Sequence, residues 1–79
     1  MEAYQSTREI MYKRIREMRK REHYTQLQMA QQLKISRRTY ANYERGVHAM
    51  PVEVLVLIAD LFGTSLDYLA GREEFHGAA

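Results

Sequence analysis

Apolar residues along this chain recur mostly three or four positions apart, which is the spacing of one face of an α-helix. The two-residue alternation of a half-buried β-strand is not sustained over any useful length. The pattern therefore predicts an all-α fold of five helices, over residues 7–22, 26–33, 37–45, 51–62 and 66–70.

Start and stop signals bound these helices. Ser6 and Thr25 are each followed three residues later by Glu or Gln, which is the spacing of a capping box. Ser36 and Ser65 are further N-cap candidates, and Pro51 suits a first helical turn. Glycines at positions 46, 63 and 71 follow the last three segments, where a helix C-terminus favours them.

The first four segments each have an apolar stripe suited to a core. The stripes are Met11, Ile15 and Met18 with Ile10 alongside; Met29, Ala30 and Leu33; Tyr40 and Tyr43; and Leu55, Ile58, Ala59 and Phe62. The two tyrosines could instead stack on nucleic-acid bases, but their helical spacing favours the core. The opposite face of the first segment is basic, with Lys13, Arg14, Arg16, Lys20 and Arg21.

The second and third segments are the most informative part of the chain. Only two residues separate Leu33 from the Ser36 cap, and so short a link forces the helices to pack at a steep angle, as in a helix-turn-helix. Arg37 and Arg38 fall in a first helical turn, where the helix dipole disfavours cations. They suit an anion there, since guanidinium groups pair with guanine edges in the DNA major groove, and Asn42 can pair with adenine. The alternative is that all three are ordinary solvated residues.

Composition narrows the class of protein. A chain of 79 residues forms one small domain with a modest core. Dimerisation would supplement the stability of that core. The absence of cysteine excludes disulfides, thiol catalysis and cysteine-based zinc sites. The longest apolar run, residues 54–59, is too short to span a membrane, and no signal peptide opens the chain. We therefore expect a soluble, cytoplasmic protein without cofactors.

Charge is divided unevenly along the chain. Residues 1–46 contain eleven Lys or Arg against five Asp or Glu, whereas residues 47–79 contain one against five. The net charge of +2 thus combines +6 with −4. A basic half indicates a surface for a polyanion, although a set of solvated helix faces would give the same totals.

Four pieces of the sequence resemble the helix-turn-helix transcription regulators of the phage-repressor and Cro type, also called the xenobiotic-response-element family. In order, they are IREMRK, YTQLQMAQQL, ISRRTYANYERG and LIADLFGTSLDYLAG. The match covers residues 14–72, roughly three quarters of the chain. The resemblance implies a five-helix domain that binds operator DNA, usually as a two-fold dimer.

The resemblance also implies roles by position. Arg37, Arg38 and Asn42 match positions that reach DNA bases, and Gln26, Thr39 and Arg45 match positions that contact phosphates. Gln26 would also support the recognition helix, residues 37–45. Arg19 and Glu44 match a pair that often forms a partly buried salt bridge between the first and third helices. We add Arg19 and Lys34 to the phosphate-contacting set.

Two residues depart from the family pattern. Many members have glycine just after the second helix, where φ is positive, and often another glycine shortly before that helix. This chain has Lys34 and His23 at these positions. A non-glycine residue with positive φ is strained by roughly 1–2 kcal/mol, so Lys34 indicates either a strained turn or a turn of another shape.

A second apolar stripe follows the core stripe along the fourth segment. It consists of Val54, Leu57 and Leu61, and with Leu66, Tyr68 and Phe75 it suggests a self-association surface. A central helix buried on most sides would show the same pattern, but members of the family often dimerise through their last helices. A two-fold dimer would set its recognition helices about 34 Å apart, to read a palindrome.

No metal or catalytic site is evident. The histidines at positions 23, 48 and 76 are far apart and have no carboxylate at ligand spacing. Asp60 and Asp67 would need a cleft to act as an acid–base pair, and five short helices offer little concavity. We therefore do not expect an enzyme.

The sequence predicts a helix-turn-helix domain over residues 7–71, with mobile segments at 1–6 and 72–79. We expect it to bind an inverted-repeat operator in double-stranded DNA as a homodimer and to repress transcription. No membrane partner or small-molecule substrate is evident. Two alternatives stay open: an antitoxin or restriction–modification controller that uses the same domain, and a protein-interaction module with incidental DNA affinity.

Overall fold

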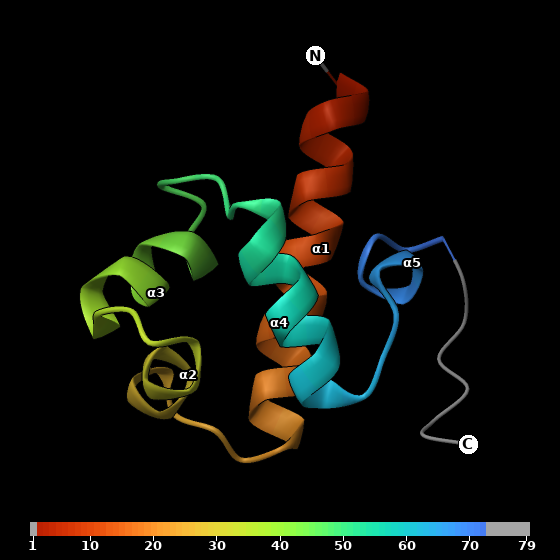
Figure 1. The fold of residues 1–79 in the computed structure, drawn as a ribbon. Coiled ribbons are helices and arrows are strands. Elements are labelled where there is room, and N and C mark those ends of the chain that lie inside the picture. The colour runs from red at the N-terminus through yellow and green to blue at the C-terminus, as the bar shows by residue number, and fades with distance from the viewer. Residues whose placement is uncertain (1, 73–79) are drawn as a thin grey trace.

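Five α-helices make up the computed structural model, which describes the backbone of residues 2–72 and the side chains of residues 6–72. They are α1 (Glu2–Arg21), α2 (Gln26–Leu33), α3 (Arg37–Glu44), α4 (Val52–Phe62) and α5 (Leu66–Leu69). Residues 2–72 contain no β-strand, so the all-α prediction is confirmed. α2 and α3 lie to one side of α1 and α4, and α5 lies to the other (Figure 1). The tail predicted to be mobile, including Phe75, lies outside the described residues from position 73 on.

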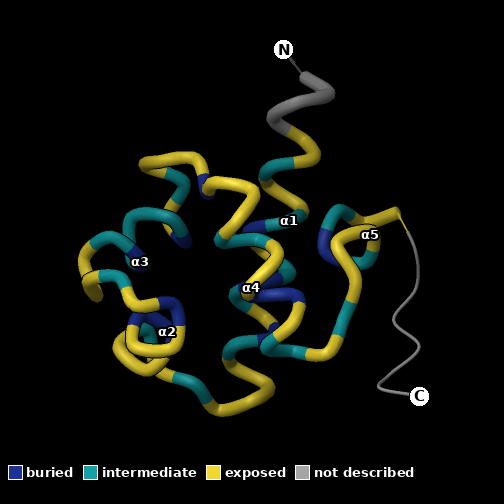
Figure 2. The backbone as a smooth tube through the Cα atoms, in the orientation of Figure 1, coloured by how far each residue is buried: buried dark blue, intermediate teal, exposed yellow. Residues whose placement is uncertain are grey.

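Every helix contributes to one core. The largest fully enclosed side chains come one from each helix, and are Ile15, Met29, Tyr40, Ile58 and Leu69. Buried positions accordingly occur on every helix around a shared interior (Figure 2). Burial of a large apolar side chain contributes roughly 1.5–3 kcal/mol. Because each helix needs the others to enclose its side chain, we expect the five to fold as one unit.

Two expectations about α1 are wrong. The helix starts at Glu2, so Ser6 lies inside it and is not its N-cap. Ile10, expected beside the core stripe, is 42% exposed, whereas Tyr12 is buried. The Tyr12 hydroxyl accepts a hydrogen bond from the backbone N–H of Met50 at 2.5 Å. This contact between residues far apart in sequence turns Tyr12 toward the core, which a local pattern does not reveal.

The other helix boundaries lie within a residue or so of their predicted positions. The predicted caps Thr25, Ser36 and Ser65 each accept a hydrogen bond from the backbone N–H three residues later. Pro51 is an exception, since it forms the N-cap of α4 and does not belong to its first turn. In the predicted core stripe of α4, Ile58 and Ala59 are buried, and the other two residues are only partly so.

All five helices end in the same backbone motif. A residue with positive φ follows each helix, and two successive amides donate to carbonyls of its last turn. After α2, for example, the Lys34 N–H donates to the Gln31 carbonyl at 3.3 Å and the Ile35 N–H to the Ala30 carbonyl at 3.0 Å. The positive-φ residues are His23, Lys34, Gly46, Gly63 and Gly71. The turn after α2 therefore has the shape that glycine favours, with lysine in place.

Candidate nucleic-acid interface

α2 and α3 form the helix-turn-helix, with residues 34–36 between them. At the start of α2, Thr25 Oγ1 accepts from the Gln28 N–H at 3.0 Å, and Gln28 Oε1 accepts from the Thr25 N–H at 2.8 Å. At the start of α3, the Ser36 hydroxyl accepts from the Thr39 N–H at 3.0 Å. Side-chain caps therefore fix the first turn of both helices.

α3 lies at one edge of the molecule with a face toward solvent (Figures 1 and 2). Arg37, Arg38 and Arg45 are exposed, while Thr39 and Asn42 are partly exposed. The first turn of α3 contains no acidic residue, and among the described side chains none of the three arginines has a carboxylate partner. The structure thus presents the predicted base-contacting residues on a surface of uncompensated positive charge.

The tyrosines of α3 are in the interior or at its edge. Tyr40 is fully buried, and its hydroxyl donates to Glu44 Oε2 at 2.5 Å. Tyr43 is partly buried and packs against the core. The core prediction is therefore confirmed for Tyr40, which has no exposed ring on which a base could stack.

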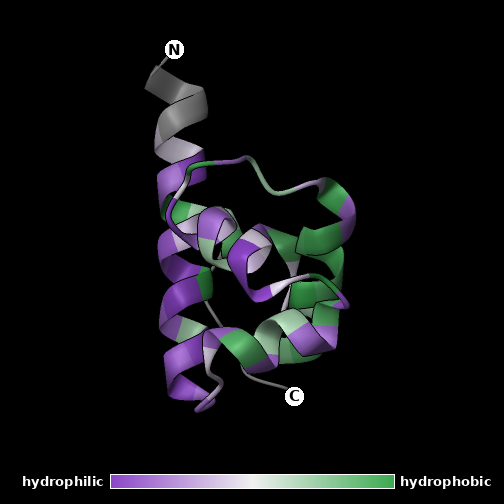
Figure 3. Cartoon of the chain, turned by 90° about the vertical axis from the view of Figure 1, so that its left-hand side faces the viewer, coloured by the Kyte–Doolittle hydropathy of each residue, from purple (hydrophilic) through white to green (hydrophobic). Residues whose placement is uncertain are grey.

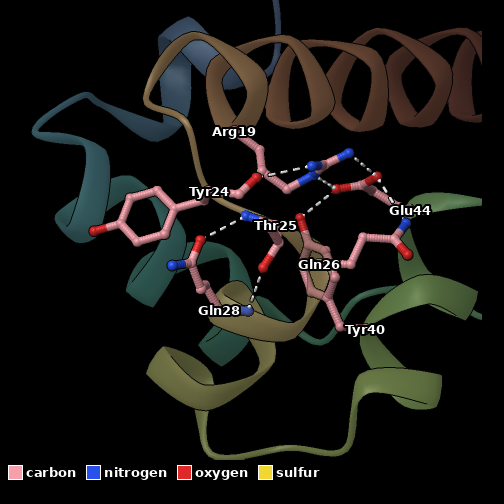
Figure 4. A network of polar contacts seen from close by, with 7 residues as sticks. All are labelled: Arg19, Tyr24, Thr25, Gln26, Gln28, Tyr40 and Glu44. Carbon is pink, nitrogen blue, oxygen red and sulfur yellow. Dashed lines mark hydrogen bonds and ion pairs between the residues drawn. The ribbon is translucent and has the colours of Figure 1, made fainter.

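A buried polar network joins α3 to α1 and α2 (Figure 4). The Glu44 carboxylate is 4% exposed and accepts from Arg19 Nε at 2.6 Å and from Arg19 Nη2 at 3.2 Å. It also accepts from Gln26 Nε2 at 3.3 Å and from the Tyr40 hydroxyl. Arg19 Nη1 donates to the Tyr24 carbonyl at 2.9 Å. The predicted Arg19–Glu44 ion pair is present, and it is the centre of this network.

The network sets the protonation of its members. Burial alone would raise the pKa of the Glu44 carboxyl, but hydrogen bonds from Arg19, Tyr40 and Gln26 hold that pKa below its ordinary value. Burial raises the pKa of Tyr40, and its hydrogen bond to the Glu44 carboxylate raises it further. Glu44 therefore stays ionised and Tyr40 stays a neutral donor around neutral pH.

The geometry separates the roles predicted for Arg19 and Gln26. All three guanidinium nitrogens of Arg19 donate within the protein, and its side chain is only 11% exposed. These contacts give Arg19 a structural role, and the phosphate contact predicted for it stays a prediction. Gln26 is the first residue of α2, partly exposed, and its amide reaches Glu44 on α3. It supports the recognition helix as expected, and its phosphate contact stays a prediction, as do those of Lys34, Thr39 and Arg45.

Apolar side chains remain at the surface of α4 and α5. Of the predicted interface residues, Leu57 is 49% exposed and Leu66 is 38% exposed, whereas Val54, Leu61 and Tyr68 are partly buried. We call these five residues the α4–α5 surface. Val52 and Val56 on α4 are exposed as well. Hydrophobic residues, buried and exposed alike, are more frequent on the side of the fold opposite α1, which is largely hydrophilic (Figure 3).

Arg14 has a role that the sequence did not indicate. It was expected on the solvated face of its helix, but its guanidinium carbon lies 4.4 Å from the centroid of the Tyr68 ring. Arg14 Nη1 also donates to the Tyr68 carbonyl at 2.8 Å. The pair attaches α5 to α1 through a contact across 54 positions of sequence, for which no local signal exists.

Neither a metal cluster nor a membrane-spanning helix is found among the described residues. No group of three or more His, Cys, Asp and Glu side chains there is placed to hold a metal ion. None of the helices there is long and apolar enough to cross a membrane. His23 and His48 are both exposed, and His76 lies outside the described residues.

Comparisons with known proteins point to a single family. A family model described as Helix-turn-helix matches residues 15–69. Over 61 residues the chain is 41% identical to the HTH-type transcriptional regulator AnsR of Bacillus subtilis (strain 168). It is 36% identical over 62 residues to the HTH-type transcriptional regulator ImmR of the same strain. It is 42% identical over 59 residues to the cryptic phage CTXphi transcriptional repressor RstR of Vibrio cholerae serotype O1.

The chain spans about half the length of the curated relatives it matches. The matched residues cover 77% of this chain and 53% of AnsR, 78% and 49% for ImmR, and 75% and 53% for RstR. No solved structure gives a significant match. The similarity to these relatives therefore concerns the helical domain described above.

Proposed function

Since the chain belongs to the helix-turn-helix family of the phage-repressor and Cro type, we propose that it represses transcription by binding an inverted-repeat operator as a homodimer. Membership of the family makes the domain a DNA-binding domain of a transcription regulator. RstR is named as a transcriptional repressor, which supports repression as the mode of action.

The observation that carries the proposal is that the first turn of α3 is exposed and cationic, while a buried polar network around Glu44 holds the helix in place. Arg37 and Arg38 lie at the positive end of a helix dipole, where they do not favour stability. The opposite face of α3 is anchored through Glu44 to α1 and α2. The arginines therefore extend from a helix whose position is fixed, as bidentate contacts to guanine require.

Phosphate contacts would surround this reading face. Gln26 opens α2, Lys34 lies in the turn before α3, and Thr39 and Arg45 lie on or next to α3. These phosphate contacts would position α3 in the major groove, where Arg37, Arg38 and Asn42 would contact the bases. Because neutralised phosphates release counterions, affinity should fall steeply as salt rises.

Dimerisation would use the α4–α5 surface. Leu57 and Leu66 expose apolar area there that a folded monomer leaves in water. Two-fold symmetry would then set a pair of recognition helices about 34 Å apart, one DNA turn, which matches an inverted repeat.

Selection of bound duplexes from a random DNA pool tests the proposal. The full chain is compared with Arg37→Ala/Arg38→Ala and with the control Arg72→Ala, which removes an exposed cation beyond α5. We expect the full chain and the control to enrich an inverted repeat with guanines in each half-site, and the double variant to lose it.

Two other results would contradict the proposal. Failure to enrich any sequence at moderate salt would remove operator binding and favour a protein partner. Enrichment that survives loss of both arginines would show that other residues read the bases.

A further inference from the structure

A groove of about 550 Å³ lies between the middle of α1 and the end of α3, and its lining includes none of the residues that would read bases. We call it the α1–α3 groove, and it is lined by Arg8, Tyr12, Lys13 and Arg16 of α1 and by Arg45 and Gly46, together with two acids. Its volume lies in the range of small-ligand sites. Neither the predicted DNA contacts nor the α4–α5 surface uses the α1 residues of this groove.

The charge of the α1–α3 groove is positive. Its lining has four cations against two carboxylates, those of Glu9 and Glu44. Glu44 is committed, because its oxygens already accept hydrogen bonds from Arg19, Gln26 and Tyr40. Only the exposed Glu9 is left to offset the cations. A concave surface lined by one sign of charge concentrates ions of the opposite sign.

Arg8 is held in position within the α1–α3 groove. Its Nη2 donates to the Gly46 carbonyl at 2.7 Å, and its guanidinium carbon lies 5.3 Å from the centroid of the Tyr12 ring. The Arg8 Nε is buried and has no hydrogen-bond partner in the structure. A buried donor without an acceptor is uncommon in folded proteins, and it often marks a position where an ion or a water molecule binds.

We propose that the α1–α3 groove binds a phosphate group. The guanidinium of Arg8 is held by the Gly46 carbonyl and the Tyr12 ring, and Arg16 and Lys13 line the same groove and carry further charged donors for an oxyanion. The lining has two more cations than acids, which matches the charge of a phosphate monoester near neutral pH better than that of a single carboxylate.

The phosphate has two possible sources that present the same oxyanion acceptors, a free phosphorylated molecule and the DNA backbone. The charge of the lining favours the first, because a monoester carries about two negative charges and a backbone diester carries one. In both cases its binding is coupled to α3, because Arg45 and Gly46 belong to the groove and directly follow that helix. The binding of free phosphate does not depend on the proposed operator binding. The two hypotheses can therefore fail separately.

The first arm of the test uses the full chain without DNA. Inorganic phosphate and pyrophosphate are titrated in while backbone amide shifts are followed by NMR, at constant ionic strength. Arg16→Gln is compared with Arg72→Gln, which removes one charge from an exposed arginine outside the groove. We expect saturable shifts at the lining residues, weakened about tenfold by Arg16→Gln and unchanged by Arg72→Gln.

The second arm measures the salt dependence of DNA affinity for the same variants. If a backbone phosphate occupies the α1–α3 groove, Arg16→Gln should lower the slope of log K against log salt by about one unit relative to Arg72→Gln. If a free phosphate occupies it, the slopes should agree, and added pyrophosphate should change the DNA affinity of the unmodified chain and of Arg72→Gln much more than that of Arg16→Gln.

Arg8→Lys provides a second variant, which keeps the positive charge and removes the planar guanidinium with its paired N–H donors. It should weaken phosphate binding without changing the net charge of the groove. The proposal is overturned if Arg16→Gln and Arg8→Lys behave like Arg72→Gln in both arms. Phosphate binding without any operator selection would instead sink the proposed function and leave this site standing.

Discussion

Lys34 and His23 have a left-handed backbone conformation. After the other three helices of this chain, a glycine has that conformation. Their φ angles are 59° and 63°, close to those of Gly63 and Gly71 at 63° and 77°. For a residue with a side chain this conformation costs about 1–2 kcal/mol. We propose that a phosphate contact made by the Lys34 ammonium group offsets this cost.

Lys34→Gly should stabilise the isolated domain. It relieves the left-handed strain, and part of that gain is lost because glycine is more flexible in the unfolded chain. We expect a net gain of about 0.5–1 kcal/mol, or a rise in Tm of a few degrees, in thermal unfolding without DNA.

Gln32→Gly is the matched control, because Gln32 is exposed within α2 and has helical backbone. It should destabilise the domain by about 0.5–1 kcal/mol. A destabilising Lys34→Gly would contradict the strain argument, whatever its effect on DNA affinity.

Glu44 makes stability depend on pH in a definite direction. Its pKa is lower in the folded protein than in the unfolded chain, so its stabilising effect is complete above the unfolded value of about 4.3. That effect is lost as pH falls through the folded pKa. Urea unfolding of the unmodified chain and Glu44→Gln at several pH values should therefore show a difference that is largest near pH 7 and shrinks below about pH 4.5.

The size of that difference at pH 7 should be about 3–5 kcal/mol, because Glu44→Gln leaves the Arg19 cation partly buried without its carboxylate. Tyr40→Phe removes one hydrogen bond to the carboxylate and should cost less, about 1.5–3 kcal/mol. Glu17→Gln, at an exposed acid of α1, is the control with little effect. An equal loss in all three variants would refute a special role for the network.

At the scale of whole helices, the sequence predicted most closely the boundaries of helices that start at a side-chain N-cap. α2 and α3 were predicted closely because Thr25 and Ser36 fix their starts within four residues of sequence. The start of α1 was not, because a Ser followed by Glu three residues on is also tolerated inside a helix. The enclosure of Tyr12 and the pairing of Arg14 with Tyr68 were missed because they depend on contacts 38 and 54 positions away.

The same distinction holds for the candidate site. The exposed start of α3 followed from its cap, whereas the Arg19–Glu44 pair followed only from the family resemblance, since its members are 25 positions apart. Glu44 as a shared acceptor for Tyr40 and Gln26 was not predicted at all. Local chemistry thus predicts which residues a helix exposes, and long-range contacts decide what holds that helix in place.

The helix-turn-helix should divide its DNA contacts between base reading and charge neutralisation. Arg38→Ala should cost about 1–3 kcal/mol on the selected operator and relax preference at one base pair. Lys34→Ala should instead weaken binding to all sequences alike and lower the salt slope by about one unit. Binding titrations of both variants on operator and mismatched duplexes, over a range of salt, would distinguish the two effects. A uniform loss for Arg38→Ala would place it among the phosphate contacts.

At the scale of the whole molecule, the charge and the apolar surface lie on different parts of the fold. The cationic residues that would face DNA are in α3, in the turn before it and directly after it, whereas the acidic half of the chain contains α4 and α5 with their exposed leucines. DNA binding and dimerisation would therefore not compete for the same residues. This separation predicts that a substitution can remove either DNA binding or dimerisation while the monomer stays folded.

Leu57→Glu should remove the dimer and leave the fold intact. Leu57 is already half exposed in the monomer, so the change costs the fold little, whereas a carboxylate on the α4–α5 surface would be costly to bury between two copies. Leu27→Glu is a close control, since Leu27 on α2 is 48% exposed against 49% for Leu57. In sedimentation equilibrium without DNA, we expect a dimer for the unmodified chain and for Leu27→Glu, and a monomer for Leu57→Glu with unchanged helical content. A monomeric unmodified chain would exclude the α4–α5 dimer, whereas a dimer that persists in Leu57→Glu would place the interface elsewhere.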